Sequence, residues 1–411
     1  MKYVISGPNH VVKNIIRIPS SKSISNRMLI LKALASSDFP LENLSSSDDT
    51  RLLQEALAST GSPRDVGHAG TAMRFLTAYF SVRPEGLVLT GSERMKQRPL
   101  GPLVEALRVL GADIAYLETE GCPPVMIRSG ITRGGTVEVD GGISSQFISA
   151  LMMIGPLLPG GLHIRLLGEV VSHTYMEMTA ALMREGGINV SIRENEILIP
   201  QGSYRFKEYV VESDWSGASY WYQVAALLPG SEISLPYLSP SSLQGDSVLT
   251  ELFIKLGVES EFTGQGLIVH SGSAVSRGEF RADCTGFPDL VQTLATTLCA
   301  LDIPFHLTGT RTLRVKETDR IAALHEELGK LGFVLQSDQR GDWLGWKGEK
   351  KKPEEAPVIE TYHDHRMALA FAPLSCTFGK ISIADPMVVS KSYPSFWADL
   401  EEAGFSLSVS S

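Results

Sequence analysis

The chain has 411 residues, enough to bury two or three cores, and 43% hydrophobic with 20% charged residues is the balance of a folded globular protein. A net charge of -9 argues against general nucleic-acid binding, so an anionic ligand must meet a few focused basic residues. The four cysteines lie far apart with no CxxC pair, which disfavours zinc or redox motifs and fits a reducing cytoplasm. No signal-peptide core or membrane-spanning apolar run is present in the sequence.

Six segments of the chain share one pattern. Small or polar residues open an apolar helix, which ends at a Gly or Pro turn and is followed by a short strand. The open N-termini of such helices are either ordinary caps or parts of an anion-binding site. The six helices are expected to begin near Ser20, Ala69, Ser144, Trp215, Phe287 and His363.

A second, more charged helix and a β-hairpin follow in five of the six segments. The first segment is the exception, because its second helix runs through residues 61–67 directly into the next segment. We therefore expect an α/β fold of βαβαββ units, three in each of two domains, with the first unit truncated. The predicted domains are residues 20–211, and residues 1–19 together with 212–411, where the last strand can pair with the N-terminal strand.

Cations gather at the openings of the first helices. Lys22 and Arg27 lie in the first turns, and Ser23 is four residues from Arg27, so a hydroxyl and a guanidinium can converge on one anion. Arg98 precedes Pro99, which favours an extended Arg98 at a helix entrance. Both groups are interpreted either as anion ligands or as solvated surface cations.

Charged groups also open the later helices. Asp289 is a lone carboxylate at the first turn of its helix, where it can cap the helix or act as a base. The sequence RVKETDR is expected to place Lys316 and Arg320 on one helical face, with Glu317 beside them as a group that can carry protons.

The last two charged openings are HDHRM and KSYP. HDHRM places two histidines, a carboxylate and Arg366 at the start of a very apolar helix, where charge is costly unless it is paired or binds a ligand. A metal site is the rival interpretation, but no further ligand cluster completes it. Lys391, taken alone, is typical of a surface lysine. Together the motifs indicate an enzyme for small, multiply anionic substrates.

The segments PSSKSISNR, HAGTAMRFL, RMKQRPLGPL, ISSQF, VSHTY, FPDLVQTLA, RVKETDR, TYHDHRMA and KSYP resemble the EPSP synthase family over nearly the whole chain. The resemblance implies a two-domain EPSP-synthase-like fold with the active site in the cleft between the domains. It also implies transfer of the enolpyruvyl group of phosphoenolpyruvate to the 5-hydroxyl of shikimate 3-phosphate, in the shikimate pathway to chorismate and aromatic amino acids. It implies no cofactor, no metal, no nucleic-acid or membrane partner, a cytoplasmic location and a monomer.

Roles for individual residues follow from the resemblance, position by position. It implies that Asp289 takes the proton of the 5-hydroxyl and that Glu317 gives and takes protons at the methylene carbon, with Lys22 as the competing acid. The residues implied to bind shikimate 3-phosphate are Ser23, Arg27, Ser144, Ser145, Gln146, Ser172, Tyr175, Asp289 and Lys316. Those implied to bind phosphoenolpyruvate are Lys22, Gly70, Arg98, Gln146, Arg320, His365, Arg366 and Lys391.

Four positions depart from the family's pattern. His68 stands where the family usually has Asn, and Phe75 where it usually has Pro. Because both flank Gly70, the resemblance implies an altered response to the inhibitor glyphosate, of either direction. Thr312 and Leu313 replace a usual Asn-Trp pair, which removes one expected substrate contact.

Two alternative functions remain from the sequence. The sister enolpyruvyl transferase that acts on UDP-N-acetylglucosamine usually carries a reactive cysteine on a mobile loop, whereas Cys122 lies in the hairpin sequence GCPPV. The other alternative is a catalytically impaired anion-binding homologue, or a relative that acts on RNA 3′-phosphate ends. Asp289, Glu317 and the acidic net charge disfavour this second group.

Overall fold

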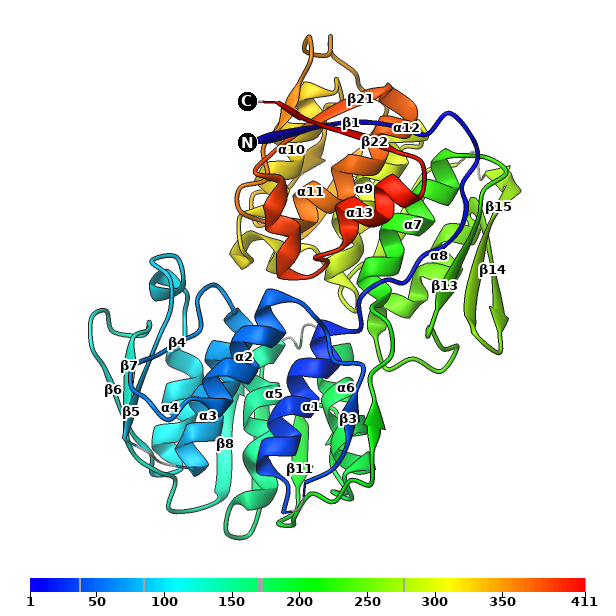
Figure 1. The fold of residues 1–411 in the computed structure, drawn as a ribbon. Coiled ribbons are helices and arrows are strands. Elements are labelled where there is room, and N and C mark those ends of the chain that lie inside the picture. Colours follow the sequence, from blue (N-terminus) through cyan, green and yellow to red (C-terminus); the bar gives the residue numbers. More distant parts are fainter. Residues whose placement is uncertain are drawn as a thin grey trace. The chain divides into compact units, whose positions relative to one another are not determined.

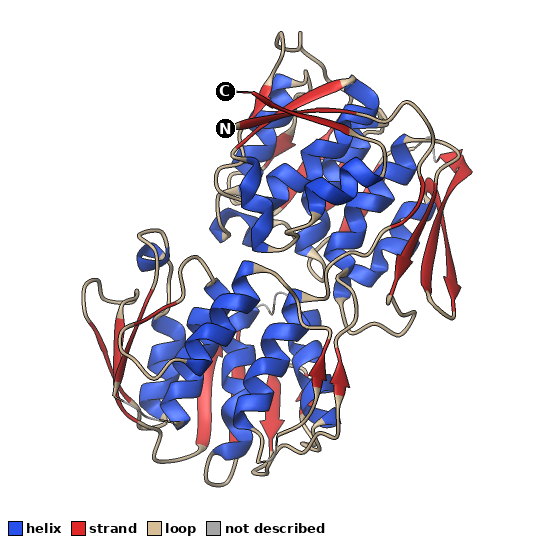
Figure 2. Ribbon diagram, in the orientation of Figure 1, coloured by secondary structure: helices blue, strands red, loops and turns tan. Residues whose placement is uncertain are grey.

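The computed structural model describes residues 1–36, 38–83, 86–142, 144–168, 170, 173–275 and 278–410, and for residues 273–275 the backbone alone. The contacts within the chain divide it into two compact units (Figure 1). We call Ser20–Val211 the N-terminal unit, and Met1–Pro19 with Glu212–Ser411 the C-terminal unit. In each unit, helices fill the interior and strands lie at the periphery (Figure 2).

Three inner helices form the centre of the N-terminal unit, and each is followed by an outer helix. The inner helices α3 and α5 are buried over nearly their whole length, because their sequences are apolar on every side. The outer helix α2 buries one stripe, including Asp49, Leu53 and Ala56, and exposes Arg51 and Glu55. The inner helices are α1 (Lys22–Leu34), α3 (Gly70–Val82) and α5 (Ser145–Ile154), and the outer ones are α2 (Asp48–Ala58), α4 (Gly101–Val109) and α6 (His173–Glu185).

The C-terminal unit repeats this arrangement. Its inner helices contribute large side chains such as Trp215, Trp221 and Phe371 to one continuous hydrophobic core. The inner helices are α7 (Trp215–Leu227), α9 (Val291–Ala300) and α11 (His365–Phe371), which continues through η6 (Ala372–Leu374) into α12 (Ser375–Phe378); the outer helices are α8 (Leu249–Ile254), α10 (Arg320–Lys330) and α13 (Phe396–Glu402). Among the described residues, no helix has both the length and the apolar character needed to span a membrane.

Short 3-10 turns precede or follow several helices and carry some of the candidate site residues. They are η1 (Met95–Gln97), η2 (Gly155–Leu157), η3 (Gly245–Val248), η4 (Pro288–Leu290), η5 (Arg311–Val315) and η7 (Pro386–Lys391).

Five four-stranded sheets share one topology, in which a parallel pair is extended by an antiparallel hairpin. In the N-terminal unit they are β4 (Arg64–Asp65), β5 (Leu87–Thr90), β7 (Val125–Ser129) and β6 (Asp113–Tyr116), and β8 (Gly135–Asp140), β9 (Leu162–Leu167), β11 (Glu196–Ile199) and β10 (Ser191–Arg193). In the C-terminal unit they are β2 (Lys13–Ile15), β13 (Glu232–Pro236), β15 (Gly266–Val275) and β14 (Leu256–Thr263); β16 (Phe280–Asp283), β17 (Phe305–Thr308), β19 (Trp343–Trp346) and β18 (Gln336–Ser337); and β20 (Val358–Ile359), β21 (Lys380–Ala384), β1 (Lys2–Ser6) and β22 (Ser406–Ser410).

The N-terminal strand completes the last of these sheets. β1 pairs with β22 and β21, as the sequence predicts, so the two ends of the chain lie side by side (Figure 1). The first unit of the repeat has only the parallel pair of β3 (Leu41–Glu42) and β12 (Tyr209–Val210). Its hairpin is therefore absent from the described residues, and the prediction of a truncated first unit is confirmed.

The chain exchanges two strands where it passes from one unit to the other. β2 precedes α1 in sequence but pairs in parallel with β13 of the C-terminal unit. β12 precedes α7 in sequence but pairs in parallel with β3 of the N-terminal unit. Each unit therefore completes one parallel pair with the strand that precedes, in sequence, the first inner helix of the other unit.

Candidate active site

The C-terminal unit gathers three carboxylates around one buried guanidinium. Arg320 begins α10 and is only 1% exposed. Its Nε lies 2.7 Å from Asp364 Oδ2, and its Nη1 lies 3.1 Å from Asp289 Oδ1. Its Nη2 lies 2.9 Å from Glu317 Oε2. Burial opposes the charge of Arg320, but the carboxylates, above all Asp364, outweigh it and raise the pKa of the guanidinium, which stays cationic.

Two of the three carboxylates remain accessible. The side chains of Asp289 and Glu317 are 18% and 16% exposed, whereas that of Asp364 is completely buried. Asp364 is also the N-cap of α11, and it accepts a hydrogen bond from the backbone N–H of Arg366 at 3.0 Å. Asp364 therefore holds the scaffold together, and Asp289 and Glu317 are the carboxylates that a ligand can reach.

Further cations surround the two accessible acids. Arg366 Nη2 lies 2.8 Å from Asp289 Oδ2, and Lys316 Nζ lies 3.7 Å from Asp289 Oδ1. Lys391 donates a hydrogen bond of 2.8 Å to Glu317 Oε1. Burial lowers the pKa of Lys316, although the charge of Asp289 opposes this effect. The arrangement places cations for an anionic ligand within reach of two acids that can exchange protons.

Asp289 serves this cluster and does not cap α9. It lies in η4, and α9 begins at Val291 after an N-cap residue, Leu290, that makes no side-chain hydrogen bond. Of the two interpretations left open by the sequence, helix capping is therefore wrong. The carboxylate instead contacts cations that come from later parts of the chain.

The helix α10 begins later than the sequence suggests. α10 starts at Arg320 because the Asp319 carboxylate accepts hydrogen bonds from the backbone N–H groups of Ile321 and Ala322, at 3.1 and 3.0 Å. Lys316 lies before this start, at the end of η5, so the expectation that Lys316 and Arg320 share a helical face is wrong. Both nevertheless reach Asp289.

The surface interpretation of Lys391 is also wrong. Lys391 is the last residue of η7, and its side chain is 11% exposed because it points to Glu317. Arg98 has the extended backbone expected before Pro99, but α4 begins only at Gly101. Pro102, and not Pro99, therefore occupies the first turn of that helix.

The two histidines of HDHRM have different environments. His365 is 1% exposed, and its Nδ1 lies 3.6 Å from Asp364 Oδ1. His363 is almost fully exposed, and its Nδ1 lies 3.3 Å from Asp385 Oδ2. In the part of the chain that the structure describes, no three His, Cys, Asp or Glu side chains are grouped as a metal ion would require.

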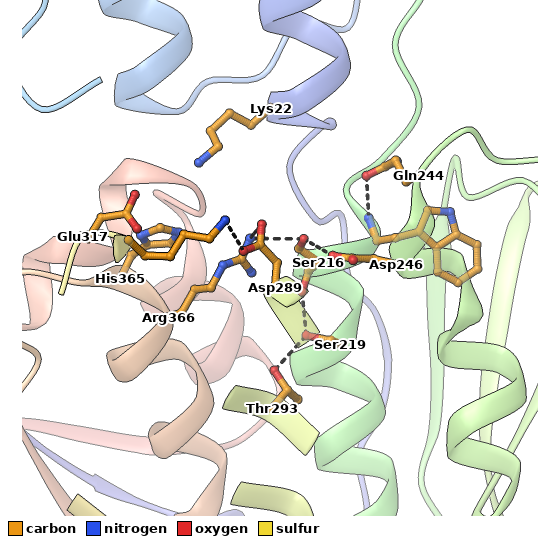
Figure 3. A network of polar contacts seen from close by, with 12 residues as sticks. Lys22, Ser216, Ser219, Gln244, Asp246, Asp289, Thr293, Glu317, His365 and Arg366 are labelled. Atoms are coloured by element: carbon orange, nitrogen blue, oxygen red, sulfur yellow. Dashed lines mark hydrogen bonds and ion pairs between the residues drawn. The ribbon is translucent and has the colours of Figure 1, made fainter. Parts of the chain in front are cut away.

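Sequence reasoning missed an acid and a hydroxyl beside this cluster. Ser216, in the first turn of α7, donates a hydrogen bond to Asp246 Oδ2, and Arg366 Nη2 lies 3.3 Å from the same hydroxyl oxygen (Figure 3). Asp246 is 5% exposed, and burial together with the charge of Asp289 raises its pKa to about 7. The only signal in the sequence was an acid after Gly245 at the start of a helix, which is also typical of a cap.

The N-terminal unit holds its buried cation differently. Arg27 on α1 is 3% exposed, and its Nε donates a hydrogen bond to Thr179 Oγ1 at 2.7 Å. Its Nη1 bonds the Ser23 carbonyl at 2.9 Å, and its Nη2 bonds Ser149 Oγ at 3.1 Å and the Tyr175 carbonyl at 3.4 Å. Ser23 and Tyr175 thus accept these hydrogen bonds through their backbone carbonyls, and Arg27 Cζ also lies 5.8 Å from the centre of the Tyr175 ring. Burial lowers the pKa of Arg27 to about 10.

Other predicted residues of the N-terminal unit lie at helix starts. Lys22 is the first residue of α1, and its Nζ lies 3.4 Å from Asp49 Oδ2. Gly70 is the first residue of α3, where the Arg98 guanidinium packs so closely that an added Cβ would lie 2.8 Å from Arg98 Cζ. Any larger residue at position 70 would require the Arg98 guanidinium to move.

Three further predicted residues lie at the start of α5. Ser144 is its N-cap and accepts a hydrogen bond from the Gln146 N–H at 3.4 Å. Ser145 is buried, and the Gln146 side chain donates to Thr71 Oγ1 of α3 at 3.1 Å. Ser172 lies outside the described residues.

The four departures from the family's pattern have distinct surroundings. His68 Nδ1 lies 2.8 Å from Ser92 Oγ at the protein surface. Phe75 is fully buried, and Arg27 Cζ lies 5.5 Å from the centre of its ring. Leu313 is fully buried, while the buried Thr312 hydroxyl has no hydrogen-bond partner among the described residues. The Leu313 side chain therefore belongs to the core.

Comparisons with known proteins find relatives that match nearly the whole chain. The family model described as EPSP synthase (3-phosphoshikimate 1-carboxyvinyltransferase) matches residues 6–65 and 53–400. A protein named 3-phosphoshikimate 1-carboxyvinyltransferase from Bacteroides fragilis (strain YCH46) is 47% identical over 411 residues, covering 100% of this chain and 99% of that protein. One of the same name from Shewanella sediminis is 36% identical over 426 residues, covering 97% of this chain and 98% of that protein.

A solved structure confirms the predicted fold class. The EPSP synthase from Acinetobacter baumannii superimposes with a TM-score of 0.80 at 22% identity, covering 99% of this chain and 100% of that one. At this identity the likeness shows the fold alone.

Proposed function

Because this chain belongs to the EPSP synthase (3-phosphoshikimate 1-carboxyvinyltransferase) family, we propose that Asp289 and Glu317 carry the proton transfers of its reaction. The reaction transfers the enolpyruvyl group of phosphoenolpyruvate to the 5-hydroxyl of shikimate 3-phosphate and releases phosphate. One observation carries the assignment: Asp289 and Glu317 are the two accessible carboxylates on the Arg320 guanidinium.

In the first step, the 5-hydroxyl oxygen adds to C2 of phosphoenolpyruvate. Asp289 accepts the hydroxyl proton, and Glu317 donates a proton to the methylene carbon, which becomes a methyl group. Lys22 is the competing donor for that proton. The product of this step is a tetrahedral adduct, in which C2 carries both the phosphate and the new ether oxygen.

In the second step, the adduct loses phosphate and a methyl proton. Glu317 takes the proton back, the C2–C3 double bond forms again, and the C2–O bond to phosphate breaks. Positive charge develops at C2 during this cleavage, so fixed carboxylates nearby lower its energy. Lys391 and Arg320, both hydrogen-bonded to Glu317, hold that carboxylate in place.

The anionic groups of the substrates require cations. We assign phosphoenolpyruvate to Lys22, Gly70, Arg98, Gln146, Arg320, His365, Arg366 and Lys391, and shikimate 3-phosphate to Ser23, Arg27, Ser144, Ser145, Gln146, Ser172, Tyr175, Asp289 and Lys316. The cations of this set have different partners within the protein. Arg320 and Arg366 contact the Asp289 carboxylate, whereas Arg27 bonds neutral hydroxyl and carbonyl oxygens. The cleft implied between the two units stays a proposal, as do a monomeric state and a cytoplasmic location, with which the four free cysteines are compatible.

The test is phosphate release from phosphoenolpyruvate, measured with and without shikimate 3-phosphate. We expect release only with both substrates. Asp289→Asn should lower kcat by about 10²–10⁴-fold, which is the usual contribution of a general base. Asp399→Asn is the matched control, because Asp399 is another partly buried acid of the C-terminal unit, on α13, and accepts from Ser395 Oγ at 3.0 Å.

Each outcome has a clear meaning. No release by the wild type with both substrates would overturn the proposed function. Release with an Asp289→Asn kcat within threefold of wild type would overturn the role of Asp289 alone. An equal loss of kcat in Asp399→Asn would show that replacing any partly buried acid of this unit lowers kcat, so that the loss in Asp289→Asn would not identify a base.

A further inference from the structure

Asp246 occupies a place in the C-terminal unit that the proposed reaction does not use. It lies in η3, directly before α8, and its Oδ2 accepts the hydroxyl hydrogen of Ser216 (Figure 3). A buried carboxylate is costly unless it is paired and hydrogen-bonded. Packing of this loop alone does not offset the cost of burying the Asp246 carboxylate, which indicates a further role for it.

The Ser216 hydroxyl connects Asp246 to the catalytic cluster. A hydroxyl has one hydrogen to donate, and at Ser216 that hydrogen points to Asp246. The oxygen is then oriented to accept from Arg366 Nη2, at 3.3 Å. The same Nη2 lies 2.8 Å from Asp289 Oδ2. The orientation of the Ser216 hydroxyl therefore affects the proposed base, Asp289, through the Arg366 guanidinium.

A second contact holds the other side of this guanidinium. Arg366 Nη1 donates to Tyr220 Oη at 3.3 Å, one turn further along α7. Side chains in the first turns of α7 therefore accept hydrogen bonds from both terminal nitrogens of Arg366. The contact to Ser216 is in turn oriented by the Asp246 carboxylate.

We propose that Asp246 is a positioning residue for the proposed reaction: it fixes the Ser216 hydroxyl, which in turn holds the Arg366 guanidinium against Asp289. Without Asp246, the hydroxyl can rotate and direct its hydrogen at the Arg366 side, where donor would face donor. The contact between Arg366 and Asp289 then loosens. This inference rests on the function proposed above for Asp289 and Arg366.

The pKa of Asp246 is raised to about 7, so its charge changes near neutral pH. The proposal therefore also predicts a pH dependence of the reaction rate. The groups that face it are Asp289 of η4, Asp214 at the N-cap of α7, Arg366 of α11 and the Ser216 hydroxyl. Burial and the two aspartates favour its neutral form, while Arg366 and Ser216 favour the ionised form. As the pH falls through neutrality, Asp246 gains a proton and can donate to Ser216, which reverses the hydroxyl.

The kinetic test compares Asp246→Ala, Asp246→Asn and Ser216→Ala with wild type in the phosphate-release assay. Asp246→Ala and Ser216→Ala should each lower kcat/KM for phosphoenolpyruvate about tenfold, the usual effect of losing one hydrogen bond, with KM for shikimate 3-phosphate unchanged. Asp246→Asn keeps an acceptor and should recover most of the activity. The double variant Asp246→Ala/Ser216→Ala should be no slower than either single variant, because both changes break the same link.

The pH profile separates positioning from a merely structural role. Wild-type kcat/KM should fall as the pH drops through about 7, and Asp246→Asn, which cannot ionise, should lack that step. Glu212→Gln is the matched control, because Glu212 is also a largely buried acid and binds the loop before Asp246 through Ser242 and Gln244. It should keep the wild-type profile. Additive losses in the double variant, or the same step in Asp246→Asn, would overturn the proposal.

A crystal structure of Asp246→Ala tests the same link without turnover. The contact between Arg366 Nη2 and Asp289 Oδ2 should lengthen beyond hydrogen-bond distance, and an unchanged contact would overturn the proposal. If Asp246→Ala does not fold, the structure of Ser216→Ala answers the same question. A wild type that releases no phosphate would overturn the proposed function, while the structure would still decide whether Asp246 positions Arg366.

Discussion

Arg320 of the C-terminal unit and Arg27 of the N-terminal unit are both buried on helices of the candidate site, but they are neutralised in opposite ways. Arg320 of the C-terminal unit contacts three carboxylates. Arg27 of the N-terminal unit contacts two hydroxyls and two carbonyls, and no carboxylate lies within 4 Å of it among the described residues. Carboxylates raise the pKa of Arg320, whereas burial lowers that of Arg27 to about 10.

This difference indicates a division of tasks. A buried cation without a carboxylate keeps an unbalanced charge, which an anionic ligand can neutralise. The contacts named above use four of the five N–H donors of Arg27 and leave one on Nη1. Arg320 already has carboxylate partners, so besides its proposed contact with phosphoenolpyruvate it holds Asp289 and Glu317 in place. The N-terminal unit is thus suited to bind a phosphate, and the C-terminal unit to move protons.

The largest effect that tests this comparison is expected from Arg320→Met. The substitution removes the cation that the fully buried Asp364 shares with Asp289 and Glu317. The free energy of unfolding should therefore fall by about 3–5 kcal/mol. Urea unfolding followed by circular dichroism measures the loss.

Lys330→Met is the graded control for Arg320→Met. Lys330 pairs with the fully buried Glu327, which keeps hydrogen bonds from the Tyr362 hydroxyl at 2.6 Å and the Glu360 N–H at 3.0 Å. Its stability loss should therefore be smaller. If Lys330→Met is as destabilising as Arg320→Met, the shared guanidinium has no special role in holding the acids.

Arg27→Met should have a smaller effect on stability and a clear effect on binding. Its former partners can bond each other, because Ser149 Oγ lies 2.9 Å from Thr179 Oγ1, which also donates to the Tyr175 carbonyl at 2.7 Å. Stability should therefore fall by only about 1 kcal/mol. Isothermal titration with shikimate 3-phosphate should show an affinity loss of about 10- to 100-fold, the value of a hydrogen bond to a charged group.

Arg64→Met is the matched control for the binding experiment. Arg64 is also buried in the N-terminal unit, and its contacts include hydrogen bonds to the carbonyls of Gly61 at 3.2 Å and Ala56 at 3.0 Å. Because it is not a candidate ligand residue, its loss should leave the affinity for shikimate 3-phosphate unchanged. An equal affinity loss in both variants would mean that Arg27 acts only through the stability of the unit.

The repeat could be predicted from the sequence, but the strand exchange could not. The spacing of the helix starts predicts six units with a truncated first one, and the described residues form five four-stranded sheets and one parallel pair. The exchanged strands β2 and β12 have three and two residues. Segments this short carry no recognisable alternation of side chains, and their partners are fixed by backbone hydrogen bonds to distant residues.

The site was predictable where one motif carries several charges. RVKETDR and HDHRM contain Glu317, Arg320 and Arg366, which the fold brings to Asp289. Asp246 and Ser216 were missed because each is a single small polar residue near a helix start, where capping is the commonest role. Only the packing of α7 against η3 shows that they face each other, thirty residues apart in sequence.

The smallest expected effect sharpens the comparison from the side of Arg27. Ser149→Ala removes one neutral acceptor from Arg27 Nη2, whose other contact, to the Tyr175 carbonyl, is the longer one at 3.4 Å. Stability should fall by about 0.5–1.5 kcal/mol, measured by urea unfolding. The freed N–H can then turn to a ligand, so affinity for shikimate 3-phosphate should stay within threefold of wild type. A loss as large as that of Arg27→Met would show that Arg27 binds through the geometry set by Ser149, and that its unbalanced charge is not what attracts the anion.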